Sequence, residues 1–391
     1  MRIDTRLAAR MEKINPSSTL AITSAAKKLK SQGADVVTLA AGEPDFDTPD
    51  FIKQEAIRAI ESGFTKYTPT TGIPELKSAI CDKFKKDNNL EYAPEQIVVS
   101  CGAKHSIFNA IFVLAEEKDE VLIPVPYWVS YPEMARLAGG SVRFIPSLPE
   151  NDFKLKPKEI EKYITSKAKV LILNSPSNPS GCVYTKEELK DIARVCVENK
   201  IFVISDEIYE KIIFDGASHS SIGSFGADIY NLTITVNGFS KSHSMTGWRV
   251  GYLGAPLDVA NAISKLQDHT TSNVSSISQK AALAAVKADD KFSKEMCAQY
   301  QQRRDYCMSR LSGMKKISFV KPQGAFYIFC NISKSKMDSV TFAQKILNEE
   351  KVALIPGDGF GKDDCIRISF ATSIEQLTKG LNRLEAFLNR I

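Results

Sequence analysis

The amino-acid sequence predicts an α/β protein that is built from two domains. The chain has 391 residues, which is longer than one hydrophobic core usually supports. Through the middle of the chain, short apolar runs alternate with longer amphipathic stretches, as strands and helices do around a mostly parallel sheet. After about residue 285 a long polar helical stretch begins a different pattern. We therefore expect a large domain with helices flanking a mixed, mostly parallel sheet, followed by a smaller α+β domain.

The large domain is expected to span residues 45–285. Amphipathic stretches at residues 106–115 and 186–198 predict helices, and they lie between short apolar runs. Alternation of strand and helix favours parallel pairing, because parallel strands need a crossover connection. The buried strands are predicted from short apolar runs at residues 97–99, 121–125, 170–173, 201–204, 232–236 and 250–253.

The small domain is expected to span residues 286–391. A long polar helix at residues 291–312 comes first, and a closing helix runs to the end of the chain. Residues 1–44 form a further segment, which is helical at first and which we expect to pack with the small domain. Strands of the small domain are predicted at Phe319 and at residues 325–330, 352–355 and 365–370.

Composition and charge narrow the class of protein. The formal charge of +5 comes from interleaved basic and acidic residues, so nucleic-acid binding is not expected, whereas anionic small molecules suit it. The first thirty residues lack the apolar stretch of a secretory signal, and no apolar run approaches the roughly 20 residues of a membrane span. The eight cysteines form no CxxC pair, and the four histidines show no metal-ligand spacing. We expect a cytoplasmic protein with reduced cysteines and no metal.

Polar segments follow several predicted strands, at the place where open α/β sheets bind ligands. Gly102, Ala103 and Lys104 open a helix, where exposed backbone N–H groups can approach a phosphate. Further along, a loop stiffened by two prolines contains Asn178. Its amide is either a ligand contact or part of an ordinary surface turn.

Asp206 and Lys241 follow the next two strands. Asp206 is either a buried carboxylate that needs a cationic partner or the N-cap of a helix. Lys241 is flanked by small and apolar residues, and poor solvation there would lower its pKa and free its amine for Schiff-base chemistry. The alternative is a surface lysine, which is the commoner case. Arg249 follows shortly and offers a guanidinium for a phosphate.

These motifs together are much more specific than any one of them. The sequence resembles the class I aminotransferases of the fold-type I pyridoxal-phosphate superfamily, almost from end to end. Within that class it is most similar to the bacterial branch of aspartate and prephenate aminotransferases. The resemblance is carried by Asn178-Pro-Ser-Gly, Asp206-Glu-Ile-Tyr, Ser240-Lys, Met245-Thr-Gly-Trp-Arg, Ala41-Gly-Glu-Pro-Asp-Phe, Lys66-Tyr, Gly72-Ile-Pro-Glu-Leu, Pro126-Tyr-Trp, Gly324-Ala-Phe-Tyr and Arg367-Ile-Ser.

The resemblance implies pyridoxal 5'-phosphate as the cofactor and assigns residues to its ring. Lys241 would carry it as a Schiff base and then act as the base in the proton shift. Asp206 would pair with the pyridine nitrogen and keep it protonated. Tyr209 and Asn178 would hydrogen-bond the ring hydroxyl, and Trp128 would stack on the ring face.

The resemblance also assigns the phosphate and substrate contacts. Arg367 would bind the α-carboxylate of the substrate in a bidentate pair, together with the backbone of Gly42. Tyr67 would reach the phosphate from a neighbouring subunit, which implies a homodimer with shared sites. The phosphate cup would be formed by Gly102, Ala103, Lys104, Ser240 and Arg249.

Lys104 bears on the choice of substrate, because a second substrate carboxylate buried without a cation would cost several kcal/mol. In related thermophilic-type enzymes a lysine at this position contacts the distal carboxylate, with Trp128 and Asn178 also in the substrate site. Aspartate or glutamate with 2-oxoglutarate is therefore the first expectation. Prephenate stays open, since Asn15 stands where many relatives carry a basic residue, although Arg10 and Lys13 are near.

Other functions remain to be weighed against transamination. After aspartate and glutamate, aromatic amino acids or alanine are the next candidate amino donors. A pyridoxal-phosphate lyase is a different candidate activity, because it would use the same cofactor residues on the same fold. An effector domain of a transcription regulator would need a DNA-binding segment ahead of Ala41, where no room exists for one. The glycines of residues 357–361 match neither nucleotide-binding motif, so a Gly-rich loop is the better interpretation.

Overall fold

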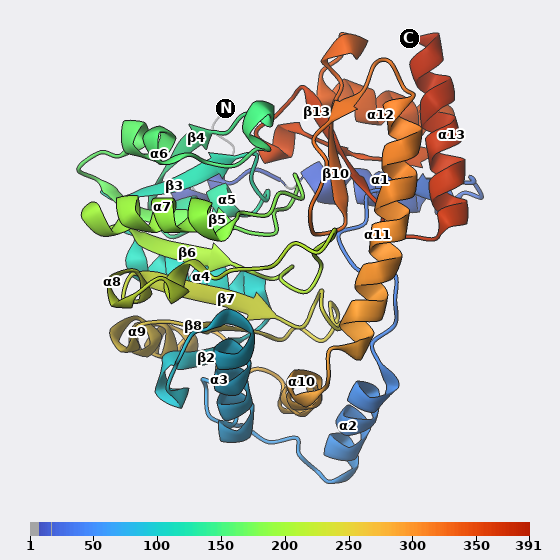
Figure 1. Ribbon diagram of the computed structural model, residues 1–391. Helices are drawn as coiled ribbons and strands as arrows, with labels where there is room; N and C mark the ends of the chain where they lie inside the picture. Colours follow the sequence, from blue (N-terminus) through green and yellow to red (C-terminus); the bar gives the residue numbers. More distant parts are fainter. Residues whose placement is uncertain (1–7, 17) are drawn as a thin grey trace.

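The computed structural model describes residues 8–16 and 18–391. Its centre is a seven-stranded sheet of order β2-β8-β7-β6-β5-β3-β4 (Figure 1). Only β8 runs antiparallel to its neighbours, so the expectation of a mixed, mostly parallel sheet is confirmed. The strands are β2 (Ile97–Ser100), β3 (Glu120–Val125), β4 (Ser141–Pro146), β5 (Ala168–Asn174), β6 (Phe202–Asp206), β7 (Thr233–Gly238) and β8 (Gly251–Gly254).

Apolar residues cover both faces of this sheet, which explains why its central strands read as continuous apolar runs. One face packs against α4 (Ala103–Leu114), α5 (Tyr131–Leu137) and α9 (Leu257–Asp268). The other packs against α6 (Pro157–Tyr163) and α7 (Lys186–Glu198). The predicted helix at 186–198 is confirmed, and the one predicted at 106–115 begins three residues earlier, directly after Gly102.

A capping box explains why α7 begins where it does. The hydroxyl of Thr185 accepts from the backbone N–H of Glu188, and the Glu188 carboxylate accepts from the backbone N–H of Thr185. Three further helices cover the β2 end of the sheet around a shared apolar cluster. They are α2 (Asp50–Glu61), α3 (Pro74–Asn88) and α10 (Ser276–Lys287).

The C-terminal part of the chain forms a second, smaller layer around its own apolar cluster. Its four-stranded antiparallel sheet has the order β12-β13-β10-β9. The strands are β9 (Ser318–Phe319), β10 (Tyr327–Asn331), β12 (Ile355–Pro356) and β13 (Cys365–Ser369). The helices are α11 (Lys291–Ser312), α12 (Ser339–Glu350) and α13 (Ile374–Arg390).

The strand predicted at residues 352–355 is wrong as one unit, because the chain divides it between two sheets. β11 (Val352–Ala353) pairs in parallel with β1 (Val37–Thr38), and only the following residues join the four-stranded sheet as β12. Four fully buried residues, Val352 to Ile355, pack on both sides here, so the apolar run does not reveal where one sheet ends.

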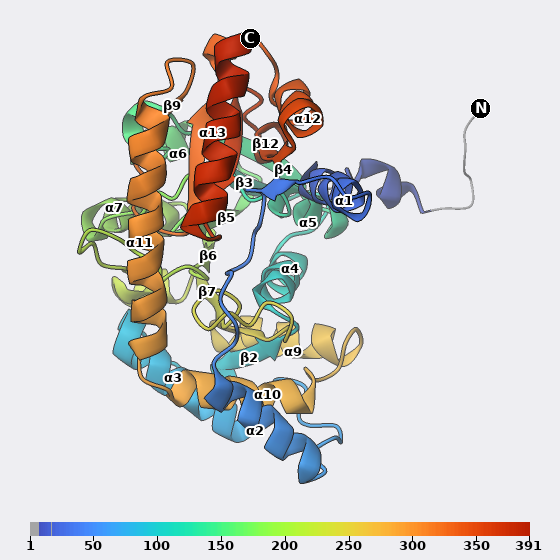
Figure 2. The same ribbon diagram turned by 90° about the vertical axis from the view of Figure 1, so that its right-hand side faces the viewer.

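The N-terminal segment lies beside the C-terminal elements (Figure 2). Helix α1 (Ser18–Ser31) contacts α12 and β12, and β1 contacts α13. Residues 1–7 of the expected helical segment lie outside the described residues. Within residues 8–16 and 18–391, none of the helices has both the length and the apolar character needed to cross a bilayer.

Candidate active site

A cavity of about 760 Å³ opens at the carboxyl ends of β5, β6 and β7. The final residues of β5 and β6, Asn174 and Asp206, lie in its wall, as expected for a ligand site of an open α/β sheet. The cavity also reaches the small layer through Tyr327 and Arg367. Eleven of the thirteen predicted site residues line it: Gly42, Ala103, Lys104, Trp128, Asn178, Asp206, Tyr209, Ser240, Lys241, Arg249 and Arg367.

Lys241 lies in the turn that follows β7, between two aromatic rings. Its ammonium donates to the backbone oxygen of Gly42 at 2.5 Å and lies 5.8 Å from the ring centres of Tyr209 and Phe326. Burial lowers its pKa to about 8, against a weaker opposing effect of Glu43. A larger fraction of this amine is therefore uncharged near neutral pH than for a surface lysine, which suits a nucleophile or a base.

Asp206 is a buried carboxylate that forms no ion pair with a described residue. Tyr131 donates its hydroxyl to Oδ2 at 2.6 Å, and the backbone N–H of Ile208 donates to Oδ1 at 3.2 Å. Burial raises its pKa to about 6, although both hydrogen bonds act in the other direction. Among the described residues no lysine, arginine or histidine forms an ion pair with it. A turn follows β6, so Asp206 is not the N-cap of a helix.

The loop with Asn178 is tied to the end of β6 and is not a surface turn. The side chain of Asn174 donates to the backbone oxygen of Asp206 at 2.9 Å, and its carbonyl accepts from the backbone N–H of Asn178 at 2.8 Å. Asn178 itself is buried, with 7% of its surface exposed. These bonds hold its side chain at the cavity wall, beside Arg367.

Arg367 is almost fully buried and is oriented by three groups. Its Nη1 donates to Asn178 Oδ1 and its Nη2 to the backbone oxygen of Ala40, both at 3.0 Å. The guanidinium lies 4.2 Å from the ring centre of Tyr327. Its Nε is buried and donates to no described residue. Because no carboxylate of the described chain neutralises it, this guanidinium fits an anion that enters from outside.

A separate corner of the cavity lies at the N-terminus of α4. Arg249 is held there by donating to the backbone oxygens of Thr246 at 2.9 Å and Cys101 at 3.1 Å. Gly102 has φ +89°, and a Cβ atom there would lie 2.5 Å from Arg249 Nη2. A glycine is therefore required for the guanidinium to approach the helix start. Together with Ser240, these groups fit the oxygens of a phosphate.

Lys104, in the first turn of α4, and Trp128 also line the cavity. The Lys104 ammonium lies 4.9 Å from the centre of the Trp128 ring. Burial, and then the nearby Arg249, lower the pKa of Lys104. Lys104 lines the cavity, and its contact with substrate stays a prediction.

Two predicted residues do not line the cavity. Gly102 lies directly behind it, against Arg249. Tyr67 is 91% exposed and is the most exposed large apolar or aromatic side chain of the described chain. A single copy of the chain therefore does not bring Tyr67 to its own cavity.

Three residues of the site were missed by the sequence reasoning: Asn174, Tyr131 and Tyr327. Tyr209 and Tyr327 share a hydrogen bond of 2.9 Å between their hydroxyls. Asn174 directly follows the strand predicted at residues 170–173, and Tyr327 is the last residue of the Gly324-Ala-Phe-Tyr motif, so the sequence carries a signal for both. Tyr131 had no such signal, because it follows the Pro126-Tyr-Trp motif as the first residue of a short helix.

The cavity has an excess of positive charge. Five cationic side chains line it, and only Glu43 and Asp206 are acidic. Such a site binds ligands with several negative groups, such as a phosphate together with carboxylates. The cationic residues are Lys27, Lys104, Lys241, Arg249 and Arg367.

A fold of this kind, with an amine of lowered pKa between a phosphate-shaped corner and an unpaired buried arginine, defines an enzyme that acts on amino or oxo acids. The family model for class I and II aminotransferases matches residues 34–384, and the chain belongs to this family. It is therefore an aminotransferase.

Relatives of known name agree with this assignment. The chain is 47% identical to an aspartate aminotransferase of Bacillus sp. (strain YM-2), over 98% of this chain and 99% of that one. It is 45% identical to a probable aspartate/prephenate aminotransferase of Aquifex aeolicus, with 98% and 99% covered. Aspartate aminotransferase from Thermus thermophilus with maleate has a similar structure, with a TM-score of 0.94, 40% identity, and 98% and 100% covered.

Proposed function

We propose that this aminotransferase moves the amino group of aspartate to 2-oxoglutarate, in two half-reactions that share one cavity and pyridoxal 5'-phosphate as cofactor. The observation that carries the proposal is Arg367, a buried guanidinium with an unused donor, in one cavity with Lys104 and Lys241. The names of the Bacillus and Thermus relatives support the same substrate. Prephenate is the second candidate, which the name of the Aquifex relative favours.

The residues of the cavity fit the cofactor. Asp206 is buried without an ion-pair partner among the described residues, so a protonated ring nitrogen would supply the missing cation. The corner at Gly102 and Arg249 is open to a phosphate because no Cβ fills it. Asn178 and Tyr209 would bind the ring hydroxyl, and Trp128 would lie against the ring. The remaining phosphate contacts would be Ala103, Lys104 and Ser240.

When bound, pyridoxal phosphate supplies an electron-withdrawing ring that stabilises negative charge at the substrate's α-carbon. Lys241 Nζ would hold the cofactor and would move the substrate's α-proton, because its lowered pKa leaves part of the amine uncharged near neutral pH. Arg367 and the backbone of Gly42 hold the α-carboxylate, which orients the Cα–H bond toward that amine. Asp206 keeps a proton on the ring nitrogen.

Lys104 would select substrates with a second carboxylate. Its ammonium faces the cavity with no acidic partner among the described residues, so a distal carboxylate would neutralise it. Aspartate and 2-oxoglutarate both carry such a group. Asn15 offers no further cation, because its amide is neutral, and its backbone and side-chain nitrogens already donate to the Glu133 carboxylate at 3.1 and 3.4 Å.

We also propose a homodimer in which Tyr67 reaches the phosphate of the other subunit. Tyr67 is exposed in the single chain, and α2, the helix just before it, also presents exposed apolar side chains. Exposed apolar side chains are common at interaction surfaces. Those of α2 are Phe51, Ile57 and Ile60.

A panel of amino donors tests the proposal. Purified protein with pyridoxal phosphate is mixed with aspartate, glutamate, alanine or phenylalanine and 2-oxoglutarate or prephenate, and the oxo acids formed are measured. Aspartate with 2-oxoglutarate is expected to be fastest. A lyase would instead release ammonia or pyruvate and leave the aldehyde form of the cofactor. Lys241→Ala is expected to bind cofactor without a covalent link and to lose turnover, and normal turnover by this variant would contradict the proposal.

A further inference from the structure

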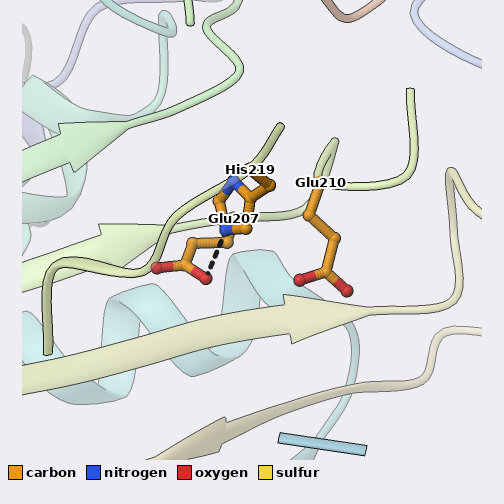
Figure 3. Close-up of side chains that lie close together, drawn as sticks. All are labelled: Glu207, Glu210 and His219. Carbon is orange, nitrogen blue, oxygen red and sulfur yellow. Dashed lines mark hydrogen bonds and ion pairs between the residues drawn. The ribbon is translucent and has the colours of Figure 1, made fainter. Parts of the chain in front are cut away.

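A buried polar network lies behind the turn that carries Asp206 and Tyr209. Those two side chains line the cavity, whereas the residue after each of them does not. Glu207 and Glu210 are instead buried, with 1% and 9% of their surfaces exposed. Figure 3 shows both carboxylates close to the ring of His219. The turn therefore presents one pair of side chains to the cavity and a second pair to this network.

Glu207 is the centre of the network. Its Oε1 accepts from the hydroxyl of Ser205 at 2.8 Å. Its Oε2 accepts from Ser221 at 2.6 Å and from the amide of Asn88 at 3.0 Å, and lies 2.8 Å from Nε2 of His219. These partners come from α3 and from the loop that precedes β7, so the end of β6 is held from two other parts of the chain.

Glu210 is paired with a basic side chain other than His219. Lys83 forms an ion pair with it and also donates to the side-chain oxygen of Asn88 at 2.6 Å. Among the described residues, His219 is then the one basic side chain paired with Glu207. Glu207, Glu210 and His219 offer ligand atoms that could hold a metal ion. However, hydrogen bonds already use both Glu207 oxygens and Lys83 neutralises Glu210, so neither carboxylate needs a metal ion. The buried Nδ1 of His219 has no hydrogen-bond partner among the described residues.

We propose that Glu207 and His219 are positioning residues for transamination: their buried, hydrogen-bonded pair fixes the reverse side of the turn whose front side presents Asp206 and Tyr209. The inference rests on the proposed function, because it assumes that those two side chains act on the cofactor. Asp206 is the last residue of β6 and Glu207 is its direct neighbour, so a shift of the Glu207 carboxylate moves the backbone that carries Asp206.

The charge on the pair reaches Asp206 as well. Glu207 raises the pKa of Asp206 through its negative charge, in addition to the larger effect of burial. A proton on His219 balances that charge. Burial alone would lower the pKa of His219, but Glu207 and Glu210 outweigh it and raise the pKa, while Lys83 acts against them. The raised pKa favours the imidazolium form of His219, which would neutralise the carboxylate next to Asp206.

Substitutions at the two positions test the proposal with opposite charge effects. His219→Leu leaves the Glu207 charge uncompensated, and Glu207→Gln removes that charge. The visible absorbance of the bound cofactor is titrated against pH for each. The midpoint is expected to rise in His219→Leu and to fall in Glu207→Gln, because a more negative surrounding favours the protonated form.

The kinetic constants supply the second measurement. We expect kcat of His219→Leu to fall by about tenfold or more, in line with losses measured for outer hydrogen-bond partners of metal ligands. KM for aspartate should stay within about twofold, since Arg367 and Lys104 do not contact the network. His219→Gln keeps a donor toward Glu207 and should recover part of kcat. His269→Gln, at an exposed histidine, is the matched control and should resemble wild type.

A purely structural role would give a different result. The melting temperature would then fall in all three network variants, while the absorbance midpoint and kcat per bound cofactor stayed at wild-type values. That outcome would overturn the proposal. If wild-type protein itself developed no visible absorbance with pyridoxal phosphate, the proposed function would fail instead, so the two failures are distinguishable.

Discussion

Several polar side chains of the site are oriented by partners from other parts of the chain. Tyr131, from α5, donates to Asp206 at the end of β6, and Asn178 accepts from Arg367 of β13. Such partners limit the rotamers of the side chains that touch ligand, which is how a site is held ready before the ligand arrives. The buried pair behind Asp206 belongs to the same pattern.

Tyr131→Phe is expected to raise the pKa of Asp206 above its value of about 6. The phenol donates to the ionised carboxylate, and such a bond is worth about 1.5–3 kcal/mol, or roughly one to two pH units. The acidic limb of the pH profile of kcat/KM should move upward by that amount. Tyr127→Phe is the matched control, because its hydroxyl makes no hydrogen bond to a described residue. Identical profiles for the two variants would contradict the prediction.

The lowered pKa of Lys241 predicts how cofactor capture depends on pH. Below about pH 8 the ammonium is protonated and cannot attack an aldehyde, and above that pH the free amine predominates. The rate at which cofactor-free protein develops visible absorbance with pyridoxal phosphate should rise with pH and level off above about 8. Lys241→Ala should develop none. A midpoint near the ordinary lysine value of about 10.4 would show that the amine is well solvated.

The start of α4 shows how one element combines several requirements. It needs a glycine for the turn, free backbone N–H groups, and space for Arg249. Gly251 adds a further limit, because a Cβ atom there would lie 2.2 Å from the backbone nitrogen of Ala103. The helix start therefore packs against β8 without side chains between them, and this brings Arg249 and the phosphate corner together.

Gly102→Ala should weaken cofactor binding as well as the fold. The backbone conformation, with φ +89°, disfavours any side chain by about 1–3 kcal/mol, and the new methyl would displace Arg249. Gly63→Ala is the control, since Gly63 has φ +73° and nothing within 4 Å of its Cβ position. Both variants should lose stability in thermal denaturation. Only Gly102→Ala should show a raised dissociation constant for pyridoxal phosphate.

The strands differ in how well they could be predicted from the sequence. The runs that became β5, β6 and β7 are buried on both faces, so apolar residues mark them clearly. β4 was missed, because it is an edge strand whose residues are mostly half-exposed or exposed. Sequence could not divide residues 352–355 either, since both resulting strands are buried and only their pairing partners differ.

The arrangement of the whole chain places the substrate residues on two layers. Arg367 belongs to the small antiparallel sheet, Asp206 ends a strand of the large sheet, and Lys241 lies in the turn after another of its strands. The segment with Gly42, which also lines the cavity, runs from β1 to α2 (Figure 2). The domain limits of 1–44, 45–285 and 286–391 stay a prediction. The pairing of β1 with β11, together with the contact of β1 with α13, brings residues near both ends of the chain together.

Assembly is the prediction that concerns the whole molecule. In the proposed dimer Tyr67 completes the phosphate corner of the other subunit, so the sedimentation mass should be twice that of one chain. Tyr67→Phe should keep that mass but weaken cofactor binding, by about 1.5–3 kcal/mol for the lost hydrogen bond to a charged group. Tyr230→Phe, at a tyrosine outside the cavity, is the comparison. A monomeric, fully active protein would contradict the shared site.

The sequence by itself predicted the fold class and most strands, because apolar runs mark buried elements, and its resemblance to class I aminotransferases assigned most of the candidate site residues. The tertiary structure decided which side chains meet across layers: Arg367 with Asn178, Tyr209 with Tyr327, and Glu207 with His219. These pairs are separated by between 12 and 189 positions in the chain. No local pattern specifies such contacts, since they depend on how the sheets and helices pack together.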